Sequence, residues 1–287
     1  MDYFMSFFIF IFAGMQKKIR KKIRRWFIIM AIVYVIGGLA LYFLQEKFLF
    51  HPEKLASGHK FSFAIPYKEI NLPFNDKKNL SIIQFTVPDS IRKGIVLYFH
   101  GNMKNIERYA PFASHFTRNK YEVWMMDYPG FGKSTGKRSE QIIYNDALQL
   151  YKMARAKVSK DSIIIYGKSI GTGVASQLAS VRNCKRLVLE TPYCSIDALF
   201  RHYAFIYPVS WLTDYHFPSN EYFKDIKDPI TIFHGTNDGT IPFSQAERLM
   251  KLAKPGDELI TLEKGGHNNL ADFPLFQHKI DSLLQLP

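Results

Sequence analysis

The sequence predicts an α/β fold, a mostly parallel sheet with helices on both faces, behind one N-terminal transmembrane helix. Apolar runs of strand length alternate with helical periodicity over residues 67–287, which is typical of a parallel sheet whose crossover helices cover both faces. An uncharged apolar run near the N-terminus is long enough to cross a bilayer. We therefore expect an N-terminal segment with a basic cluster over residues 1–25, a transmembrane helix over 26–45, a linker over 46–66 and one α/β domain after it.

The length and composition suit one large folded domain with an appendage. The 287 residues are 47% hydrophobic and 22% charged, which excludes disorder over most of the chain. The net charge is +13, but seven of the cations fall in one short cluster: Lys17, Lys18, Arg20, Lys21, Lys22, Arg24 and Arg25. Because this charge is local, we expect no nucleic-acid partner.

The expected anchor reads WFIIMAIVYVIGGLALYFL over residues 26–44, without a charge. At about 1.5 Å per residue this run covers roughly 28 Å, close to the thickness of the hydrocarbon core. A buried core helix of this length would carry polar residues on one face. A cleaved signal peptide has a shorter apolar core and a small-x-small cleavage site, whereas Gln45, Glu46 and Lys47 follow here. We expect a permanent single-pass membrane anchor.

The basic cluster lies directly before this run, while both signs of charge are mixed on its far side. By the positive-inside rule, the N-terminus is expected to be cytoplasmic and the main domain extracytoplasmic. An earlier apolar run over residues 4–15 is too short to span comfortably. It is expected to lie at the membrane interface, unless Met15 is the true start; if it spans, the orientation inverts.

The elements of the domain follow from the apolar runs. Strands are expected over residues 67–72, 80–87, 95–100, 123–127, 163–166, 187–190, 230–234 and 259–262. Helices are expected over residues 105–118, 140–157, 170–181 and 244–252, with a last helix that ends near residue 284. No helix separates the first two strands, so they are expected to pair antiparallel. An extended run between Cys184 and Cys194 holds them beyond disulfide reach, so both are expected to be free thiols.

A candidate nucleophile follows the fifth expected strand. Gly167-Lys168-Ser169-Ile170-Gly171 is a G-x-S-x-G pattern in the strand–turn–helix setting of a nucleophile elbow. The glycines let the turn close, and the serine is held in a strained conformation at the start of a helix, whose dipole favours negative charge. An ordinary glycine-rich turn is the alternative. A P-loop is excluded, because Ser162 stands where that motif needs glycine.

A serine nucleophile needs a base, and the base needs an orienting acid. In the fold that carries this elbow they follow in the order Ser, Asp or Glu, His, each after a strand. Asp238 follows strand 230–234 and His267 follows strand 259–262, so both positions meet the requirement. The competing candidates are Glu190 as the acid, and His216 or His278 as the base.

The tetrahedral intermediate of acyl transfer also needs backbone N–H donors. We expect one from Ile170, the residue after the nucleophile. The second is expected from the loop after the third strand, with Asn102 as first choice and Met103 as second. His100 in the same loop is expected to be a structural brace. We expect no metal and no cofactor.

With these residues in place, the sequence resembles the Bem46-like α/β hydrolases, close to the single-span ABHD-type enzymes. Six motifs carry the resemblance besides the elbow: LQEK at 44–47, HPEK at 51–54, HGN at 100–102, DYPGFGKS at 127–134, HGTND at 234–238 and GGH at 265–267. The resemblance implies the α/β-hydrolase fold and a serine hydrolase, and the family includes esterase-like and thioesterase-like enzymes. Met103 departs from a position where a small residue is common, and Lys168 from one often filled by an aromatic residue or histidine. The lysine is expected to favour anionic substrates or to reach solvent.

An insertion over about residues 193–228 stands where this fold places its cap. It is rich in aromatic residues: Tyr193, Phe200, Tyr203, Phe205, Tyr207, Trp211, Tyr215 and Phe217. Part of them is expected to form the cap's own core and the rest to line an acyl pocket. The expected function is hydrolysis of a carboxylic ester, with a lipid or acyl ester among the candidate substrates. A thioesterase, a serine peptidase and a non-catalytic membrane-bound binding protein are the alternatives.

Overall fold

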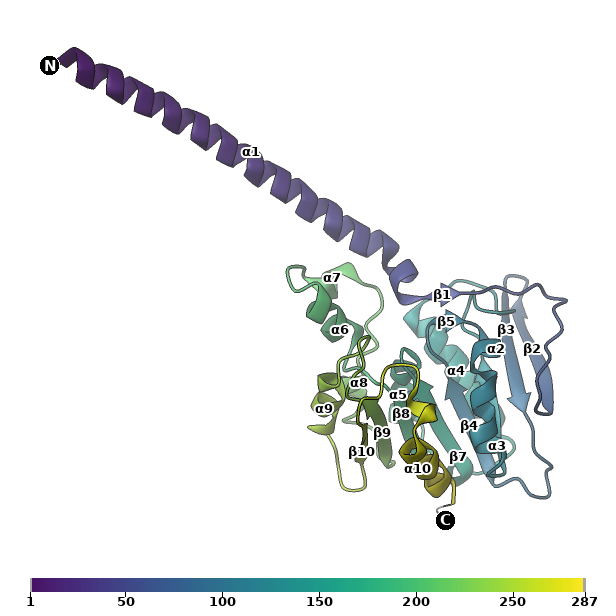
Figure 1. The fold of residues 1–287 in the computed structure, drawn as a ribbon. Coiled ribbons are helices and arrows are strands. Elements are labelled where there is room, and N and C mark those ends of the chain that lie inside the picture. The colour runs from purple at the N-terminus through teal and green to yellow at the C-terminus, as the bar shows by residue number, and fades with distance from the viewer. Residues whose placement is uncertain (1, 286–287) are drawn as a thin grey trace.

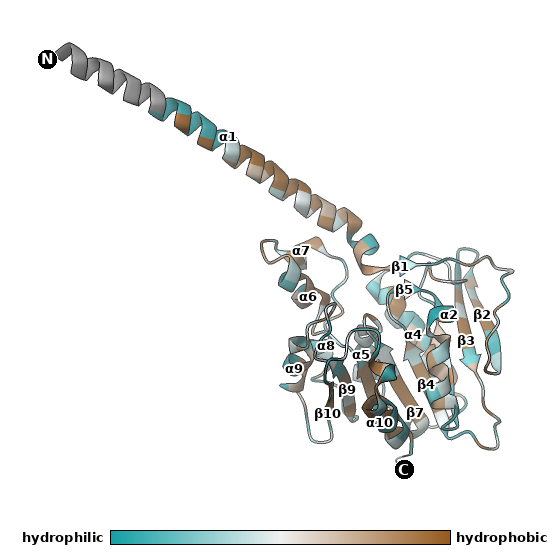
Figure 2. Cartoon of the chain, viewed as in Figure 1, coloured by the Kyte–Doolittle hydropathy of each residue, from teal (hydrophilic) through white to brown (hydrophobic). Residues whose placement is uncertain are grey.

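A computed structural model describes residues 2–285, with side chains from residue 16 onward. It has a domain built on one sheet and a long helix, α1 (Asp2–Leu49), that projects from it (Figure 1). The apolar stretch of α1 lies nearest the domain and its basic cluster farther out (Figure 2). The expectation that residues 4–15 lie at the membrane interface concerns side chains that the structure does not describe.

All eight expected strands form, in one sheet. They are β2 (Tyr67–Asn75), β3 (Lys78–Phe85), β4 (Gly94–Phe99), β6 (Tyr121–Met126), β7 (Ile163–Lys168), β8 (Arg186–Glu190), β9 (Ile230–Gly235) and β10 (Glu258–Leu262). Their order is β10-β9-β8-β7-β4-β6-β3-β2. β2 pairs antiparallel with β3, as expected; β3 also pairs antiparallel with β6, and the remaining pairs are parallel.

The helices agree with expectation except for the first. The longer ones are α4 (Glu140–Arg155), α5 (Gly171–Val181), α9 (Ser244–Met250) and α10 (Pro274–Gln285). The single helix expected over residues 105–118 is divided into α2 (Ile106–Tyr109), a 3-10 turn (Ala110–Phe112) and α3 (Ala113–Thr117). Pro111 causes the break, because it has no N–H to donate and its ring clashes with the preceding turn.

The sheet is buried on both faces because its strands are apolar at successive positions. In the central strand β4, Ile95, Leu97 and Phe99 pack with α4, α5 and α9, while Val96 and Tyr98 pack with α2, α3 and α10. All five side chains are fully buried. This pattern is what a doubly covered sheet requires.

The chain reverses direction across the sheet between β4 and β7, which are neighbours in its centre. From β4 the chain goes to β6 on one side and returns through α4 to β7 on the other. The loops that follow β4 and β7 therefore separate at the carboxyl edge, and a crevice opens between them. Ligands of open α/β sheets bind at such a point.

Residues 46–66, expected to be a linker, are instead partly integrated into the domain. α1 continues to Leu49, and β1 (His51–Pro52) pairs parallel with β5 (Met103–Lys104). The His51 N–H donates to the carbonyl of Asn102 at 2.8 Å. Leu49 and Phe50 are buried, so the end of α1 is fixed to the domain by apolar packing as well as by backbone hydrogen bonds.

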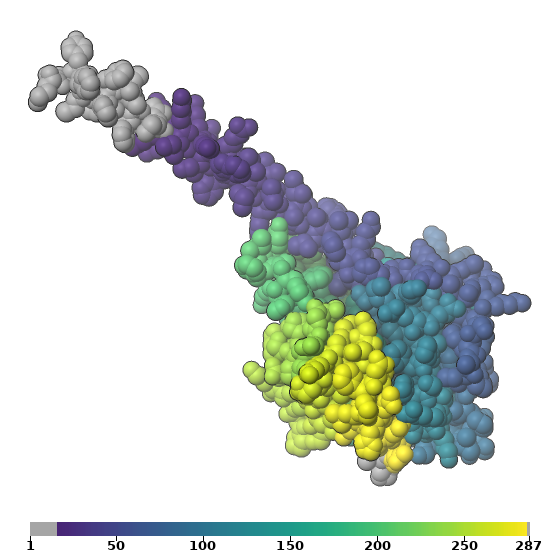
Figure 3. Space-filling model, viewed as in Figure 1, coloured from purple at the N-terminus to yellow at the C-terminus, as the bar shows by residue number. Residues whose placement is uncertain are grey.

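Three short helices, α6 (Ile196–Tyr203), α7 (Val209–Leu212) and α8 (Ser219–Tyr222), lie between β8 and β9 where the cap was expected. This cap lies directly beneath α1 (Figure 3). A carboxylate oxygen of Glu140, at the start of α4, accepts the N–H groups of His216 at 2.6 Å and Phe217 at 3.0 Å. These bonds tie the cap to the sheet domain.

Candidate active site

Ser169 stands in a tight turn between β7 and α5. Its φ of +53° lies in the left-handed region, which a residue with a side chain adopts at a cost. The turn has no room beside it: a Cβ on Gly167 would lie 2.5 Å from the carbonyl oxygen of Gly171, and one on Gly171 would lie 2.1 Å from that of Phe99. Both elbow positions therefore require glycine, because a side chain at either would clash with nearby backbone. At Gly171 this backbone is the end of β4.

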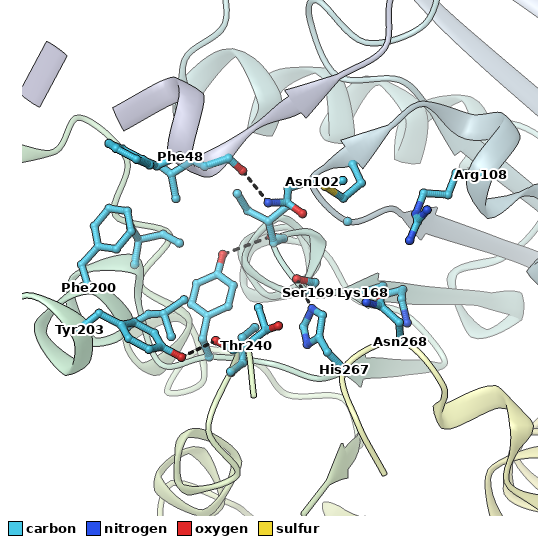
Figure 4. Close-up of a pocket in the computed structure, with 18 of the residues that line it drawn as sticks. Phe48, Asn102, Arg108, Lys168, Ser169, Phe200, Tyr203, Thr240, His267 and Asn268 are labelled. Carbon is cyan, nitrogen blue, oxygen red and sulfur yellow. Dashed lines mark hydrogen bonds between the residues drawn. The ribbon is translucent and has the colours of Figure 1, made fainter. Parts of the chain in front are cut away.

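The three residues proposed from chain order meet at this turn. Ser169 Oγ lies 3.0 Å from His267 Nε2, and His267 Nδ1 lies 2.8 Å from Asp238 Oδ2 (Figure 4). A carboxylate can only accept hydrogen bonds, so Nδ1 carries the proton and donates to Asp238, which leaves Nε2 as the acceptor for the serine hydroxyl. The arrangement has the connectivity of a serine–base–acid system.

Asp238 is held as a carboxylate. Its Oδ1 accepts the N–H groups of Thr240 and Ile241, both at 2.8 Å. Burial opposes its ionisation, but hydrogen bonds from His234 and His267 outweigh burial and hold the pKa of this carboxyl well below its usual range. Asp238 is therefore charged at neutral pH and fixes the tautomer of His267.

His234 is a positioning residue to which the sequence analysis assigned no role. It is fully buried, and its Nε2 donates to the carbonyl oxygen of Ile241 at 2.9 Å. The same nitrogen lies 3.4 Å from Asp238 Oδ2. Its place in the HGTND motif, four residues before Asp238, was the available signal.

In the described part of the chain, the side chains of the competing candidates for the acid and the base form no hydrogen bond with Ser169. Glu190 is fully buried, pairs with the ammonium group of Lys168 and accepts the hydroxyl of Tyr166 at 2.5 Å. His216 pairs with Asp197 at 3.0 Å in the cap, and His278 is exposed on α10.

The pairing with Glu190 corrects the expectation for Lys168. Its side chain is 4% exposed, so it does not extend into solvent, and its charge is compensated by Glu190. Lys168 is therefore half of a buried ion pair at the elbow, an interaction that neither expectation included.

The loop after β4 brings Asn102 beside the elbow. The side-chain amide of Asn102 donates to the carbonyl of Leu49 at 2.9 Å, and no hydrogen bond within the described chain occupies its backbone N–H or that of Ile170. The Met103 N–H instead points to the Tyr109 hydroxyl at 3.4 Å. The geometry thus favours Asn102 over Met103 as the second donor toward a ligand.

His100 braces this loop. Its ring is fully buried and stacks on Tyr109, with centroids 5.0 Å apart. Nδ1 lies 2.7 Å from the carbonyl oxygen of Gly101, and Tyr128 donates to the His100 carbonyl at 2.8 Å. The ring lies behind the loop and holds it in place.

Ser169 opens into a cleft of about 400 Å³. On one side of the serine the walls are apolar, with Phe48 from α1 and Phe200 and Tyr203 from α6 (Figure 4). On the other side Arg108 and Asn268 are polar. Among the residues with described side chains, no group of three or more His, Cys, Asp or Glu is placed to hold a metal ion.

Comparisons with known proteins agree with this fold. A family profile described as "Serine aminopeptidase, S33" matches residues 90–222, a stretch that contains Ser169 and ends before Asp238 and His267. The esterase Pf2001 of Pyrococcus furiosus has the same fold, with a TM-score of 0.63 at 20% identity over 83% of this chain and 97% of that one. A soluble variant of monoglyceride lipase from Saccharomyces cerevisiae has a TM-score of 0.59 at 16% identity, over 80% of this chain and 96% of that one.

Two curated relatives are 30% identical. They are the α/β hydrolase domain-containing protein aho-3 of Caenorhabditis elegans, matched over 67% of this chain and 57% of its own, and protein 17C of Xenopus tropicalis, matched over 66% and 60%. The chain thus spans less than two thirds of the length of these relatives. The chain has the α/β-hydrolase fold, and the profile and the relatives support an ABHD-type α/β-hydrolase family for it.

Proposed function

We propose that this chain is a membrane-anchored serine hydrolase that cleaves carboxylic esters through an acyl-enzyme. The observation that carries the proposal is the hydrogen-bonded series from Ser169 through His267 to Asp238, set in a cleft at the switch point of the sheet. Each of the three residues is held by a different feature. Close backbone contacts hold the turn of Ser169, two backbone N–H groups donate to Asp238, and His267 follows the end of β10.

In the proposed mechanism, Ser169 Oγ attacks the ester carbonyl carbon while its proton passes to His267 Nε2. Asp238 stabilises the imidazolium that forms. The C–O bond to the alcohol then breaks, and His267 returns the proton to the departing oxygen. A water molecule then attacks the acyl carbon and gives a proton to His267. As the bond from the acyl carbon to Ser169 Oγ breaks, His267 returns this proton to Oγ, and the acid leaves.

Charge develops on the carbonyl oxygen in both tetrahedral intermediates. The unoccupied N–H groups of Ile170 and Asn102 are proposed to donate to this oxygen, with help from the N-terminus of α5. Since Asn102 is held by Leu49 and His51, the donor is preorganised and needs no rearrangement when the charge appears.

The cleft walls favour an ester over a peptide with a free amino terminus. The apolar side suits an acyl chain, and Arg108 and Asn268 suit a polar or anionic group at the other end. None of the described residues that line the cleft is Asp or Glu, so an aminopeptidase substrate would leave its ammonium group without a partner. A thioester would use the same residues, and no contact in the cleft favours it.

The proposed anchor is the apolar stretch of α1. Most of its large apolar side chains are exposed: Phe27 and Phe43 are each 73% exposed, which a soluble core helix would not tolerate. The end of α1 supplies Phe48 and Leu49 to the cleft, so removal of this helix as a signal sequence would take away one wall. The helix is therefore proposed to stay in place.

A fluorophosphonate probe tests the nucleophile. The probe mimics the tetrahedral intermediate, so it should label the full-length protein and leave Ser169→Ala unlabelled, because no other hydroxyl is held against His267. Ser180→Ala on the same helix α5 serves as the control and should be labelled as the wild type is. Labelling that persists in Ser169→Ala would exclude Ser169 as the nucleophile.

The base and the acid are tested by rates of ester hydrolysis. We expect His267→Ala to lose roughly 10⁴- to 10⁶-fold in kcat, and Asp238→Asn roughly 10⁴-fold, because the latter leaves His267 in the wrong tautomer. His278→Ala, an exposed histidine on α10, should change the rate little. A nearly normal rate for His267→Ala would overturn the proposed base.

The proposed orientation, with a cytoplasmic N-terminus and an extracytoplasmic domain, is tested by cysteine labelling in intact cells. A membrane-impermeant maleimide should reach Phe74→Cys in β2 and should reach Lys17→Cys only after permeabilisation. Both native thiols are buried and give a low background. The opposite pattern of labelling would invert the orientation.

A further inference from the structure

The tip of the cap, residues 203–213, exposes large apolar side chains. Phe205 is 79% exposed, Ile206 57% and Trp211 83%. The eleven residues YAFIYPVSWLT contain no Asp, Glu, Lys or Arg, and Arg201 and Asp214 flank them. An apolar surface of this kind marks a site of contact with a partner or a membrane.

The tip is fixed to α1 near the middle of its apolar stretch. The Tyr34 hydroxyl donates to the carbonyl of Ile206 at 3.1 Å, and the rings of Tyr34 and Tyr207 stack with centroids 4.7 Å apart. Tyr207 fits against Gly37, where a Cβ would lie 2.1 Å from its hydroxyl oxygen. Small residues at this point let the cap lie directly on the helix.

This contact sets the depth of the tip. Tyr34 lies ten residues before Leu44, which is roughly 15 Å along the helix axis. A helix tilt of up to about 40° reduces this depth only to roughly 11 Å. Because Ile206 is hydrogen-bonded to the Tyr34 hydroxyl, its depth follows that of the Tyr34 side chain. If residues 26–44 of α1 span the bilayer, Ile206 and Tyr207 lie within its hydrocarbon.

The polar boundaries of the two segments coincide. Gln45, the first polar residue after the apolar stretch of α1, accepts the N–H of Asp214 at 2.7 Å. The next residue, Glu46, accepts the hydroxyl of Tyr215 at 2.7 Å. The apolar part of the cap therefore begins at the level where the apolar part of α1 begins, as two segments that share one membrane boundary would.

The backbone of the tip is also suited to hydrocarbon, where unpaired polar groups are costly. The N–H groups of Ala204, Tyr207, Val209 and Trp211 donate to carbonyls within the cap, at 2.6 to 3.0 Å. Pro208 has no N–H, and the Ile206 carbonyl is paired with Tyr34. These four N–H groups and the Ile206 carbonyl thus need no water.

Beside this contact, an apolar groove of about 250 Å³ runs between α1 and the cap. It is lined by residues 34–42 of α1 and by Tyr207, Pro208 and Leu212 of the cap. No charged side chain lines it. Its position inside the apolar stretch suits the acyl chains of lipids as its occupant.

We propose that the cap tip, residues 203–213, is a second membrane element that enters the lipid beside α1, so that the cleft takes its ester from the bilayer. The apolar wall of the cleft, with Phe48, Phe200 and Tyr203, belongs to the same two elements, α1 and α6. This inference rests on the proposed anchoring by α1. It adds a lipid-inserted cap and a membrane-resident, amphiphilic ester as the substrate class.

Depth-dependent fluorescence quenching tests the proposal on the full-length protein in phosphatidylcholine nanodiscs. An NBD label is placed on Trp211→Cys in the tip, on Ile36→Cys in α1 and on Phe74→Cys in β2; these positions are 83%, 60% and 48% exposed. Burial raises the pKa of both native thiols, Cys184 and Cys194, which keeps them unreactive. Doxyl-labelled lipids should quench positions 36 and 211 and leave position 74 unchanged.

The outcomes separate the inference from the anchor. Quenching at 36 with none at 211 would overturn the inserted tip and leave the anchor standing. Quenching at neither position would overturn both. If position 211 stayed unquenched in vesicles while Trp211→Cys crosslinked between copies, the tip would be a protein interface.

Hydrolysis by the doubly substituted Phe205→Ser, Trp211→Ser protein is a second test, because neither residue lines the cleft. We expect kcat/KM to fall roughly tenfold toward a long-chain ester dispersed in vesicles, given the apolar area lost, and to stay unchanged toward a water-soluble short-chain ester. Phe74→Ser should change neither value. An equal effect on both esters, or no effect on either, would contradict entry from the bilayer.

Discussion

The contact between the nucleophile turn and the end of β4 is the constraint on which the site depends. Gly171 lies so close to the carbonyl of Phe99 that no side chain fits between them. This contact holds the loop after β4 beside the turn, and Asn102, Ser169 and Ile170 line one cleft, where a carbonyl oxygen is proposed to bind. The parallel pairing of β4 with β7 holds the contact, since the two strands end together at the point where the chain reverses across the sheet.

The end of α1, the proposed membrane anchor, is hydrogen-bonded directly to the residue that is proposed as an oxyanion donor. Asn102 is hydrogen-bonded to Leu49 through its side chain and to His51 through its carbonyl. The same end of α1 binds the cap through Gln45 and Glu46. Anchor, cap and catalytic loop therefore meet within a few residues of chain. Such an arrangement lets the position of the bilayer decide which face of the cleft a substrate reaches.

Much of the fold was predictable because local patterns determine it: the eight strands are apolar runs, and the elbow is a short pattern between a strand and a helix. Ser169, Asp238 and His267 could be proposed from sequence because each follows a strand, and parallel strands bring their ends together. Pairings between distant residues were not predictable. Lys168 with Glu190, Gln45 with Asp214 and the pairing of β1 with β5 each depend on how separate elements pack. Pro111 was visible in the sequence, but the helical pattern on both sides of it favoured one continuous helix over residues 105–118.

The central claim is that Ser169 attacks an ester whose carbonyl oxygen lies between Ile170 and Asn102 and whose acyl chain lies toward α1 and α6. A structure of the full-length protein in a nanodisc, inactivated with a long-chain alkyl phosphonate, tests it most directly. The account predicts a phosphorus–oxygen bond to Ser169, a phosphonyl oxygen within hydrogen-bond distance of both N–H groups, and the alkyl chain along Phe48 and Phe200. An adduct on another residue, or a phosphonyl oxygen turned away from Asn102 and Ile170, would contradict it.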